Sequence, residues 1–286
     1  MYGAMIRVSV AAAAAVAFGL MCAHAASAAE PPRRVVSYNA CADQLLLALA
    51  DPAQIAALSP YAVDSTVSVL ADKARAFPRI DFQAESIIPL NPDLVLVGPQ
   101  FGLVTRPILQ ALGFRVVPVD VVNTLEAARA QIRSVADLLG HPERGEALVA
   151  ELDAALKRLA AAPHPPSSTA LLVENGGYTI GPDSLASALM GLAGFTPPPG
   201  APSGFGGVVP LEKLVALRPD YLVTSSVLEQ ANGQGALYLT HPALRALYPP
   251  ARRILLPARY TLCGGPGLVA ALDYLTTVVT RLAAER

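Results

Sequence analysis

The chain has 286 residues, a formal net charge of −1 at pH 7, 53% hydrophobic residues and 15% charged residues. This length is sufficient for one large domain or two of ordinary size. The near-zero charge argues against a nucleic-acid partner, which would favour a strongly basic surface.

The first thirty residues have the pattern of a secretory signal. Arg7 precedes the apolar run VSVAAAAAVAFGLMCA, and the small residues Ala26–Ala28 match a cleavage site. The run is too short for a comfortable membrane span. We therefore predict a signal peptide over 1–29 and a periplasmic protein, in a compartment where paired cysteines form disulfides. A lipoprotein anchored at Cys22 is the less favoured alternative, because Met21 before it fits such a signal poorly.

From residue 33 onward, short apolar strands alternate with helices. A β-branched strand leads through a polar corner into an apolar helix from about Cys41, and a second strand follows at 55–59. DLVLVG predicts a strand buried on both faces, because its apolar run lacks alternation. TRPILQALG predicts a helix that ends at Gly113, before the strand FRVVPVD. This order predicts βαβ units, and we assign 33–123 to an N-terminal α/β lobe.

The segment 124–162 is predicted to connect two lobes through helices. TLEAARAQIRSVADLLG begins with a threonine cap and ends at Gly140, and Pro142 begins the next helix. An apolar stripe along this second helix consists of Leu148, Leu152, Leu156 and Leu159. PHPPSS then breaks the chain, and 168–286 is predicted to form a C-terminal lobe with the same order of elements.

One phrase occurs in both predicted lobes. ESIIPLNPDLVLVG at 85–98 recurs as EKLVALRPDYLVTS at 212–225, with Glu, Leu, Pro and Asp in matching places. Proline stops each short helix because it has no N–H, and Asp leads into a buried strand. The predicted fold is therefore α/β, with two Rossmann-like lobes of parallel-rich sheet joined by a single long helix. We expect the ligand cleft between them, beyond the carboxyl ends of the strands.

Sequence patterns of enzymes and metal sites are lacking. The chain contains no G-x-S-x-G, no H-E-x-x-H and no P-loop, and GFGG at 204–207 is predicted to be a loop rather than a phosphate cradle. His141, His164 and His241 each precede proline and lack metal-site spacing. We expect no resident metal or cofactor and no catalysis. A secreted α/β enzyme, with Cys41 or Cys263 as nucleophile and His241 as base, is the alternative from another class.

The order of these motifs resembles that of a known family. A strand, corner and helix, then ESIIPLNPDLVLVG, a connecting helix, GGYTIGPDSLASALMGLAGF and PLEKLVALRPDYLVTS are similar to class III substrate-binding proteins of ABC importers. That family includes periplasmic vitamin B12-, haem- and ferric-siderophore-binding proteins, and the resemblance covers about 33–284. It implies capture of a bulky metal chelate and delivery to an importer permease. Another small organic ligand on the same scaffold is the alternative, and we expect a monomer.

The resemblance also implies a role for Glu85 and Glu212. Family members carry an acidic residue on each lobe that meets arginines of the permease. Each of these glutamates begins a short predicted helix, where a carboxylate is favourable near the positive helix end. That local stabilisation is the simpler alternative to a docking role.

The expected cleft segments supply aromatic, amide and guanidinium groups. Vitamin B12-binding relatives line their clefts with tryptophan, which this chain lacks. Arginine suits the oxygens of an anionic chelate, whereas a free metal ion would need a His and carboxylate cage that the sequence does not offer. The candidate ligand-binding residues are Tyr38, Asn39, Tyr61, Phe101, Arg106, Tyr178, Phe205, Arg259 and Tyr260.

Cys41 and Cys263 each follow a strand and a polar corner, and each precedes a helix. Three states are open: a disulfide between the lobes, a thiolate pair that binds a soft metal, or two unrelated buried thiols. Because the corners that hold them face the predicted cleft, we expect at least one of them to line the ligand site.

Overall fold

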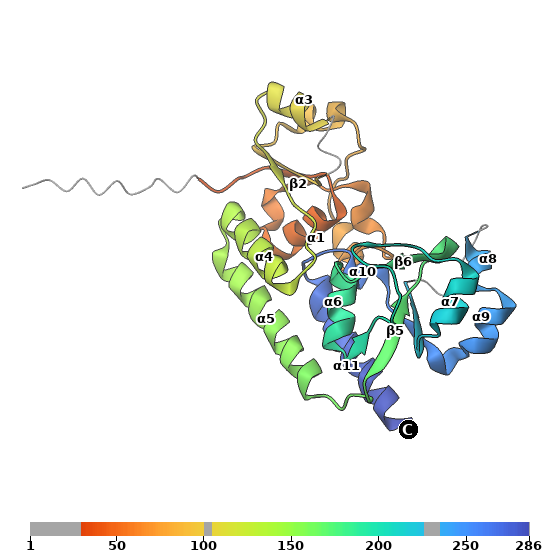
Figure 1. The fold of residues 1–286 in the computed structure, drawn as a ribbon. Helices are drawn as coiled ribbons and strands as arrows, with labels where there is room; N and C mark the ends of the chain where they lie inside the picture. Colours follow the sequence, from red (N-terminus) through yellow and green to blue (C-terminus); the bar gives the residue numbers. More distant parts are fainter. Residues whose placement is uncertain (1–29, 100–104, 226–234, 286) are drawn as a thin grey trace, which may run out of the picture. The chain divides into compact units, whose positions relative to one another are not determined.

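Two parallel sheets of four strands each organise the chain, with helices packed around both of them (Figure 1). The computed structural model describes residues 30–99, 105–225 and 235–285. The first sheet has the strand order β2-β1-β3-β4, and the second has the order β10-β9-β5-β7. This architecture confirms the predicted α/β fold with two lobes. The predicted signal peptide, 1–29, lies outside the described residues.

The first lobe follows the expected order of strands and helices. Its strands are β1 (Val35–Ser37), β2 (Ile55–Ala57), β3 (Leu94–Val97) and β4 (Val116–Pro118). Its helices are α1 (Ala40–Leu49), α2 (Ala71–Ala74) and α3 (Thr105–Ala111), with 3₁₀ turns η1 (Pro52–Gln54), η2 (Pro60–Val63), η3 (Ala84–Ser86) and η4 (Ile88–Leu90). Every residue of β3 is buried, as its continuous apolar run predicts.

The second lobe repeats this plan and adds a two-stranded antiparallel ribbon. Its strands are β5 (Ser168–Leu172), β6 (Tyr178–Ile180), β7 (Phe195–Thr196), β8 (Gly206–Val208), β9 (Tyr221–Thr224) and β10 (Arg253–Leu255). Its helices are α6 (Leu185–Leu192), α7 (Leu211–Leu217), α8 (Ala236–Leu239), α9 (Pro242–Leu247), α10 (Ala258–Thr261) and α11 (Gly267–Ala284), with η5 (Asn175–Gly177) and η7 (Pro250–Arg252).

The ribbon of β6 and β8 differs from the loop predicted for GFGG. Part of this glycine-rich segment forms β8, which pairs antiparallel with β6. Gly206 has φ +108°, and a Cβ there would lie 1.9 Å from the carbonyl oxygen of Thr179. Glycine is therefore required by close backbone approach, which is a structural reason that differs from phosphate binding.

The repeated phrase forms the same joint in both lobes. Asn91 and Arg218 precede its prolines, and both have φ 42°, the two positive values among described residues other than glycine. One residue after proline, the Asp93 carboxylate accepts hydrogen bonds from the backbone N–H groups of Arg33 and Arg34, at 2.7 and 3.0 Å. Asp220 likewise accepts from the Thr169 backbone at 2.8 Å. Each Asp thus ties the start of its own strand to the start of the neighbouring central strand.

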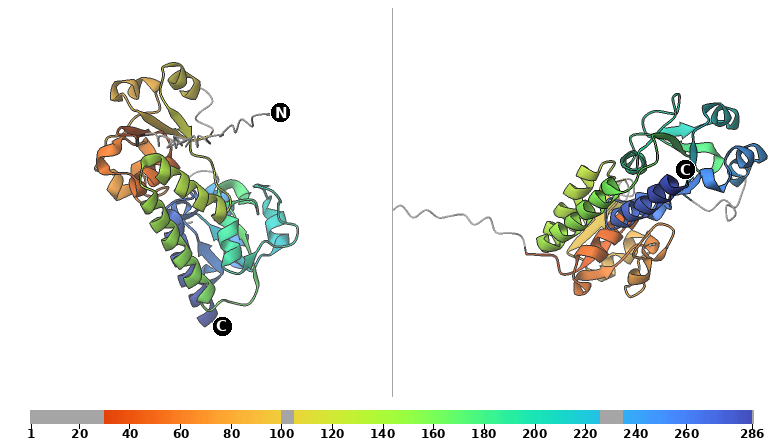
Figure 2. Two further views of the ribbon diagram at one scale, coloured as in Figure 1. Left: turned by 90° about the vertical axis from the view of Figure 1, so that its left-hand side faces the viewer. Right: turned by 90° about the horizontal axis from the view of Figure 1, so that it is seen from below.

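Two helices, α4 (Leu125–Leu139) and α5 (Pro142–Ala161), connect the lobes and lie side by side (Figure 2). Thr124 caps α4 by accepting a hydrogen bond from the Ala127 N–H, and Gly140 ends it at φ +83°. The predicted stripe lies on α5, which packs in both lobes: Leu148 in the core of the first, Leu152 and Leu159 in that of the second. The connection is therefore a helical hairpin, in which α5 is the helix shared by both cores.

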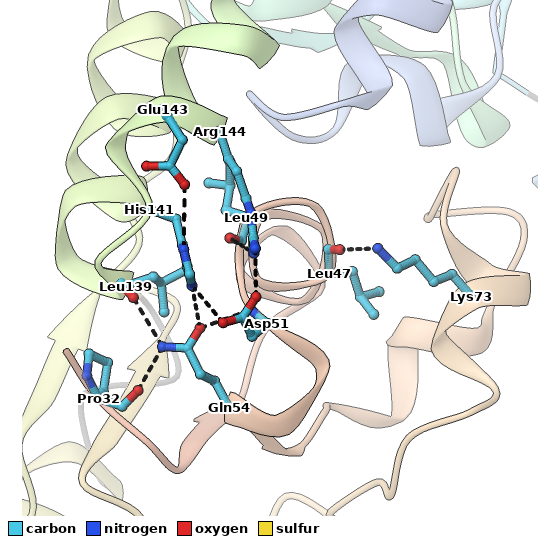
Figure 3. Close-up of polar contacts among 10 residues, drawn as sticks. All are labelled: Pro32, Leu47, Leu49, Asp51, Gln54, Lys73, Leu139, His141, Glu143 and Arg144. Carbon is cyan, nitrogen blue, oxygen red and sulfur yellow. Dashed lines mark hydrogen bonds and ion pairs between the residues drawn. The ribbon is translucent and has the colours of Figure 1, made fainter.

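A polar network fixes the corner between α4 and α5 to the first lobe (Figure 3). The Gln54 amide donates to the carbonyl oxygens of Pro32 and Leu139, at 2.7 and 3.0 Å. Arg144, in the first turn of α5, donates to the Leu49 carbonyl at 2.9 Å and to Asp51 at 2.5 Å. The guanidinium thus caps the carboxyl end of α1, where a positive charge is favourable, and it lowers the pKa of Asp51.

Helix α11 packs along α5 and completes the core of the second lobe (Figure 2). By length and composition alone it is apolar enough to span a membrane, with a mean hydropathy of 1.3. Leu268, Leu272 and Leu275 are nevertheless buried in the core. At its surface, Arg158 of α5 donates to Asp273 at 2.7 Å.

Cys41 and Cys263 form a disulfide, the first of the three states that the sequence left open. Their Cα atoms lie 5.1 Å apart although 222 positions separate them in the chain. The bond joins the first turn of α1 to the segment between α10 and α11. Nearby in the chain, the Arg259 guanidinium donates to the Ser65 carbonyl oxygen at 3.2 Å, a second contact between the lobes.

Replacing both cysteines, Cys41→Ser and Cys263→Ser, is expected to lower the free energy of unfolding by about 5 kcal/mol. The chain-entropy description of a closed loop this long gives that magnitude, because the bond restricts the unfolded chain. Urea unfolding of the oxidised protein and the variant measures the difference. The wild-type protein in excess reductant is the matched control and should lose the same amount. Equal unfolding free energies in all three samples would contradict the prediction.

Candidate functional site

A cavity of about 420 Å³ lies at the carboxyl ends of the strands of the second sheet. Leu172 ends β5, and Glu174 lies two residues beyond it. Ser225 follows β9 and Leu256 follows β10, and all four residues line the cavity. Residues 121–123, between β4 and α4, line the cavity as well, as do Thr261 and Leu262 next to the disulfide. The cavity thus lies where open α/β sheets bind ligands, next to the chain that connects the lobes.

Aromatic and aliphatic groups make up most of the cavity wall. Tyr178 of β6 and Phe205, just before β8, are 44% and 63% exposed although both line the cavity. Ile180 and Leu185 add aliphatic surface. Large aromatic side chains that remain this exposed beside an apolar hollow are typical of a surface that a ligand covers.

Glu174 is the acidic residue among the described residues that line this cavity. The Ser225 hydroxyl donates to its carboxylate at 2.5 Å, which orients the side chain. Burial raises the pKa of Glu174, and hydrogen bonds from Ser225 offset part of the rise. The main chain is fixed too, since the Glu174 N–H donates to the Tyr178 carbonyl at 2.7 Å.

In the first lobe, Tyr61 is held on a fixed corner. The buried Asp43 carboxylate accepts from the Ser59 N–H at 2.9 Å and from its hydroxyl at 2.5 Å. Burial raises the pKa of Asp43 to about 6. The Ser59 hydroxyl oxygen in turn accepts from the Tyr61 N–H at 3.2 Å. Tyr61 is 41% exposed, and its ring centroid lies 5.2 Å from that of Phe82.

Several other predicted ligand residues have structural contacts of their own. Tyr38 is 1% exposed and its hydroxyl donates to the Phe82 carbonyl, so this ring belongs to the core of the first lobe. The Asn39 side chain caps α1 by accepting from the N–H groups of Cys41 and Ala42. Tyr260 packs against Tyr274, with ring centroids 5.7 Å apart.

The two predicted arginines are not among the described residues that line the cavity. The Arg259 guanidinium lies 5.1 Å from the Tyr260 ring centroid and is held by the Ser65 carbonyl. Arg106 is partly exposed on α3. Phe101 lies outside the described residues. Of the predicted ligand residues that the structure describes, it brings Tyr178 and Phe205 together in the cavity.

The sequence-based prediction missed Glu174, although it included Tyr178, four residues further along the chain. A signal exists in the sequence, because Glu174 is a charged residue directly after the apolar strand LLV. The disulfide lies beside the cavity rather than in its wall, since neighbouring Thr261 and Leu262 line it and the two cysteines do not.

The two glutamates of the repeated phrase are both exposed. Glu85 lies in η3 and Glu212 in the first turn of α7, one in each lobe. Glu212 raises the pKa of Tyr238, though less than burial does. Their side chains are therefore free to meet a partner protein.

Comparison with known proteins identifies the family. Residues 35–247 match the family described as "Periplasmic binding protein". No curated protein sequence matches the chain significantly.

Several solved structures share the fold. The haem-binding protein RhuT from Roseiflexus sp. RS-1 is 27% identical, with a TM-score of 0.71 over 88% of this chain and 99% of that one. BhuT, solved with two haems, is 26% identical, with a TM-score of 0.71 over 87% and 98% of the two chains. The vitamin B12-binding protein BtuF of Vibrio cholerae has a TM-score of 0.66 at 18% identity, over 90% and 99%.

These relatives are binding proteins, and the cavity at the strand ends suits ligand capture. The family match spans most of both lobes, from β1 to the end of α9. The chain belongs to the periplasmic binding protein family.

Proposed function

We propose that this protein captures a flat metal chelate of the haem class in the periplasm and delivers it to an ABC importer. The observation that carries the proposal is the cavity of about 420 Å³ with the exposed aromatic rings of Tyr178 and Phe205 at its wall. An apolar macrocycle gains by covering such rings, both through burial of apolar area and through stacking.

The relatives support this ligand class. RhuT and BhuT are haem-binding proteins at 27% and 26% identity over nearly the whole chain. Tyr61 provides a candidate iron ligand on the first lobe, because a tyrosine oxygen ligates the haem iron in some other haem proteins. A corrinoid or a ferric siderophore is the alternative ligand on the same scaffold.

Delivery requires export and a membrane partner. The apolar run with Arg7 before it and small residues at its end supports a signal peptide over 1–29. Exposed Glu85 and Glu212, one on each lobe, are suited to meet arginines of the importer permease. We infer that a monomer presents both lobes to the permease at once.

The variants Tyr178→Ala and Phe205→Ala are each expected to weaken haem binding by about tenfold, since each removes a stacking surface from the cavity. A visible-absorption titration with hemin measures the dissociation constants. Leu237→Ala is the matched control, because Leu237 is an exposed apolar side chain, at 68%, that does not line the cavity. If the wild-type protein does not bind hemin while it binds cyanocobalamin, the haem assignment is wrong.

Replacing Glu85 and Glu212 together with Ala is expected to abolish ligand uptake and leave ligand affinity unchanged. Exposed carboxylates that meet arginines act on association with the permease rather than on the fold. Uptake into cells or proteoliposomes, with affinity measured in parallel, tests this. A double variant with the same charge change on the connecting helices, Glu126→Ala and Glu151→Ala, should transport normally. Unimpaired uptake by the first variant would remove the docking role.

A further inference from the structure

Glu174 is the one charged group that the described residues place in the cavity wall. Among the described residues that line it, Glu174 is the single acid and no lysine, arginine or histidine is present. Asn123, Ser184, Ser225 and Thr261 contribute neutral polar groups. A carboxylate amid mostly apolar surface is costly to bury unless a donor meets it, so its presence calls for a reason.

Comparison of the two similar lobes shows that the Glu174 side chain does not cap the element that follows it. Asn39 and Glu174 occupy the same place, two residues beyond the central strands β1 and β5. Asn39 caps α1 through its side chain. Glu174 precedes the 3₁₀ turn η5 and makes no side-chain capping bond to it. Its carboxylate is therefore available to the cavity.

The Glu174 carboxylate is held ready to accept hydrogen bonds. Ser225, at the matching end of β9, donates its hydroxyl to one carboxylate oxygen at 2.5 Å. Serine is a small donor that fixes the acid without neutralising it, and the acid retains further lone pairs. A ligand that fills the cavity displaces the water that otherwise solvates these lone pairs. Each lone pair then needs either a donor from the ligand or a proton.

We propose that Glu174 determines ligand specificity, and that the end of the ligand seated against it carries a hydrogen-bond donor: an ammonium group, an amide N–H or a metal-bound water. The carboxylates of a haem-like chelate would accordingly point away from Glu174. This inference rests on the proposed function only in taking the cavity as the ligand site.

No charged side chain among the described residues pairs with the Glu174 carboxylate. Tyr178 is the other titratable side chain among the described residues that line the cavity. On the neighbouring α10, the Arg259 guanidinium is held by the Ser65 carbonyl and the Tyr260 ring. The causes of the raised pKa of Glu174 are burial and the opposing Ser225 hydrogen bonds, with no charged side chain among them.

Two fragments with the same apolar body and opposite charge test the proposal without any metal chelate: 1-naphthylmethylammonium and 1-naphthoate. Isothermal titration at neutral pH should give at least about tenfold tighter binding of the ammonium to the wild-type protein, the size of one charge-assisted hydrogen bond. In Glu174→Gln this preference should fall to about threefold or less. The matched control, Glu212→Gln, removes an exposed acid outside the cavity and should keep the full preference.

Naphthoate binding as tightly as the ammonium, an unchanged preference in Glu174→Gln, or binding of neither fragment would each overturn the proposal. Hemin titration of the wild-type protein remains a separate result. Fragment selectivity without hemin binding would reject the haem class and keep the role of Glu174. Hemin binding without fragment selectivity would do the reverse.

A ligand-free measurement distinguishes a ligand-binding acid from a structural one. Because the pKa of Glu174 is raised in the folded protein, its ionisation costs stability as the pH rises above the pKa of an unfolded glutamate. Glu174→Gln should therefore be more stable than wild type at neutral pH. This advantage should disappear once the pH falls below the pKa of an unfolded glutamate. Urea unfolding across pH measures this, and a variant less stable than wild type at every pH would show that Glu174 serves the fold instead.

Discussion

One helix, α5, belongs to two hydrophobic cores, and the arrangement of both sheets depends on that. Leu148 and Val149 lie in the core of the first lobe, whereas Leu152 and Leu159 lie in the core of the second. A straight helix with apolar side chains along one face cannot leave either core without exposing them to water. The two lobes are thus fixed to a common axis, in contrast to domains linked by flexible strands.

Two further contacts restrict the movement of one lobe relative to the other, at a place away from α5. The Cys41–Cys263 disulfide joins the start of α1 to the segment before α11, and Arg259 donates to Ser65 beside it. Helix α5 and the disulfide together attach the second lobe to the first at two separate points. Leu262, adjacent to the bond, lines the cavity, so the covalent link also sets part of its wall. A cavity whose wall is fixed before the ligand arrives loses less conformational entropy on binding.

Most of the fold could be predicted because its signals are local. The apolar run of β3, the threonine cap at Thr124 and the proline of the repeated phrase each act within a few residues. The ribbon of β6 and β8 was missed because its pairing joins distant residues, and glycines at 204–207 equally favour a loop. The left-handed conformation of Arg218, which ends α7, was also beyond prediction, since arginine rarely adopts it. Asn91 ends η4 in the same conformation, which asparagine adopts more readily.

The site was predicted less well than the fold, for a physical reason. The strand ends indicate which segments approach the cleft, but the direction of each side chain depends on packing that the sequence does not record. Tyr38 and Tyr178 each lie close to a strand end, yet Tyr38 is buried against Phe82 and Tyr178 is 44% exposed. Asn39 and Glu174 show the same divergence in matching places. In the first lobe a helix begins there and uses the side chain as its cap. In the second, a 3₁₀ turn and a β ribbon follow instead. The ribbon places Tyr178 in the cavity wall together with Glu174, whose carboxylate makes no capping bond. The two lobes thus have equivalent corners, and the element that follows each corner decides whether its polar side chain caps a helix or remains open to the cavity.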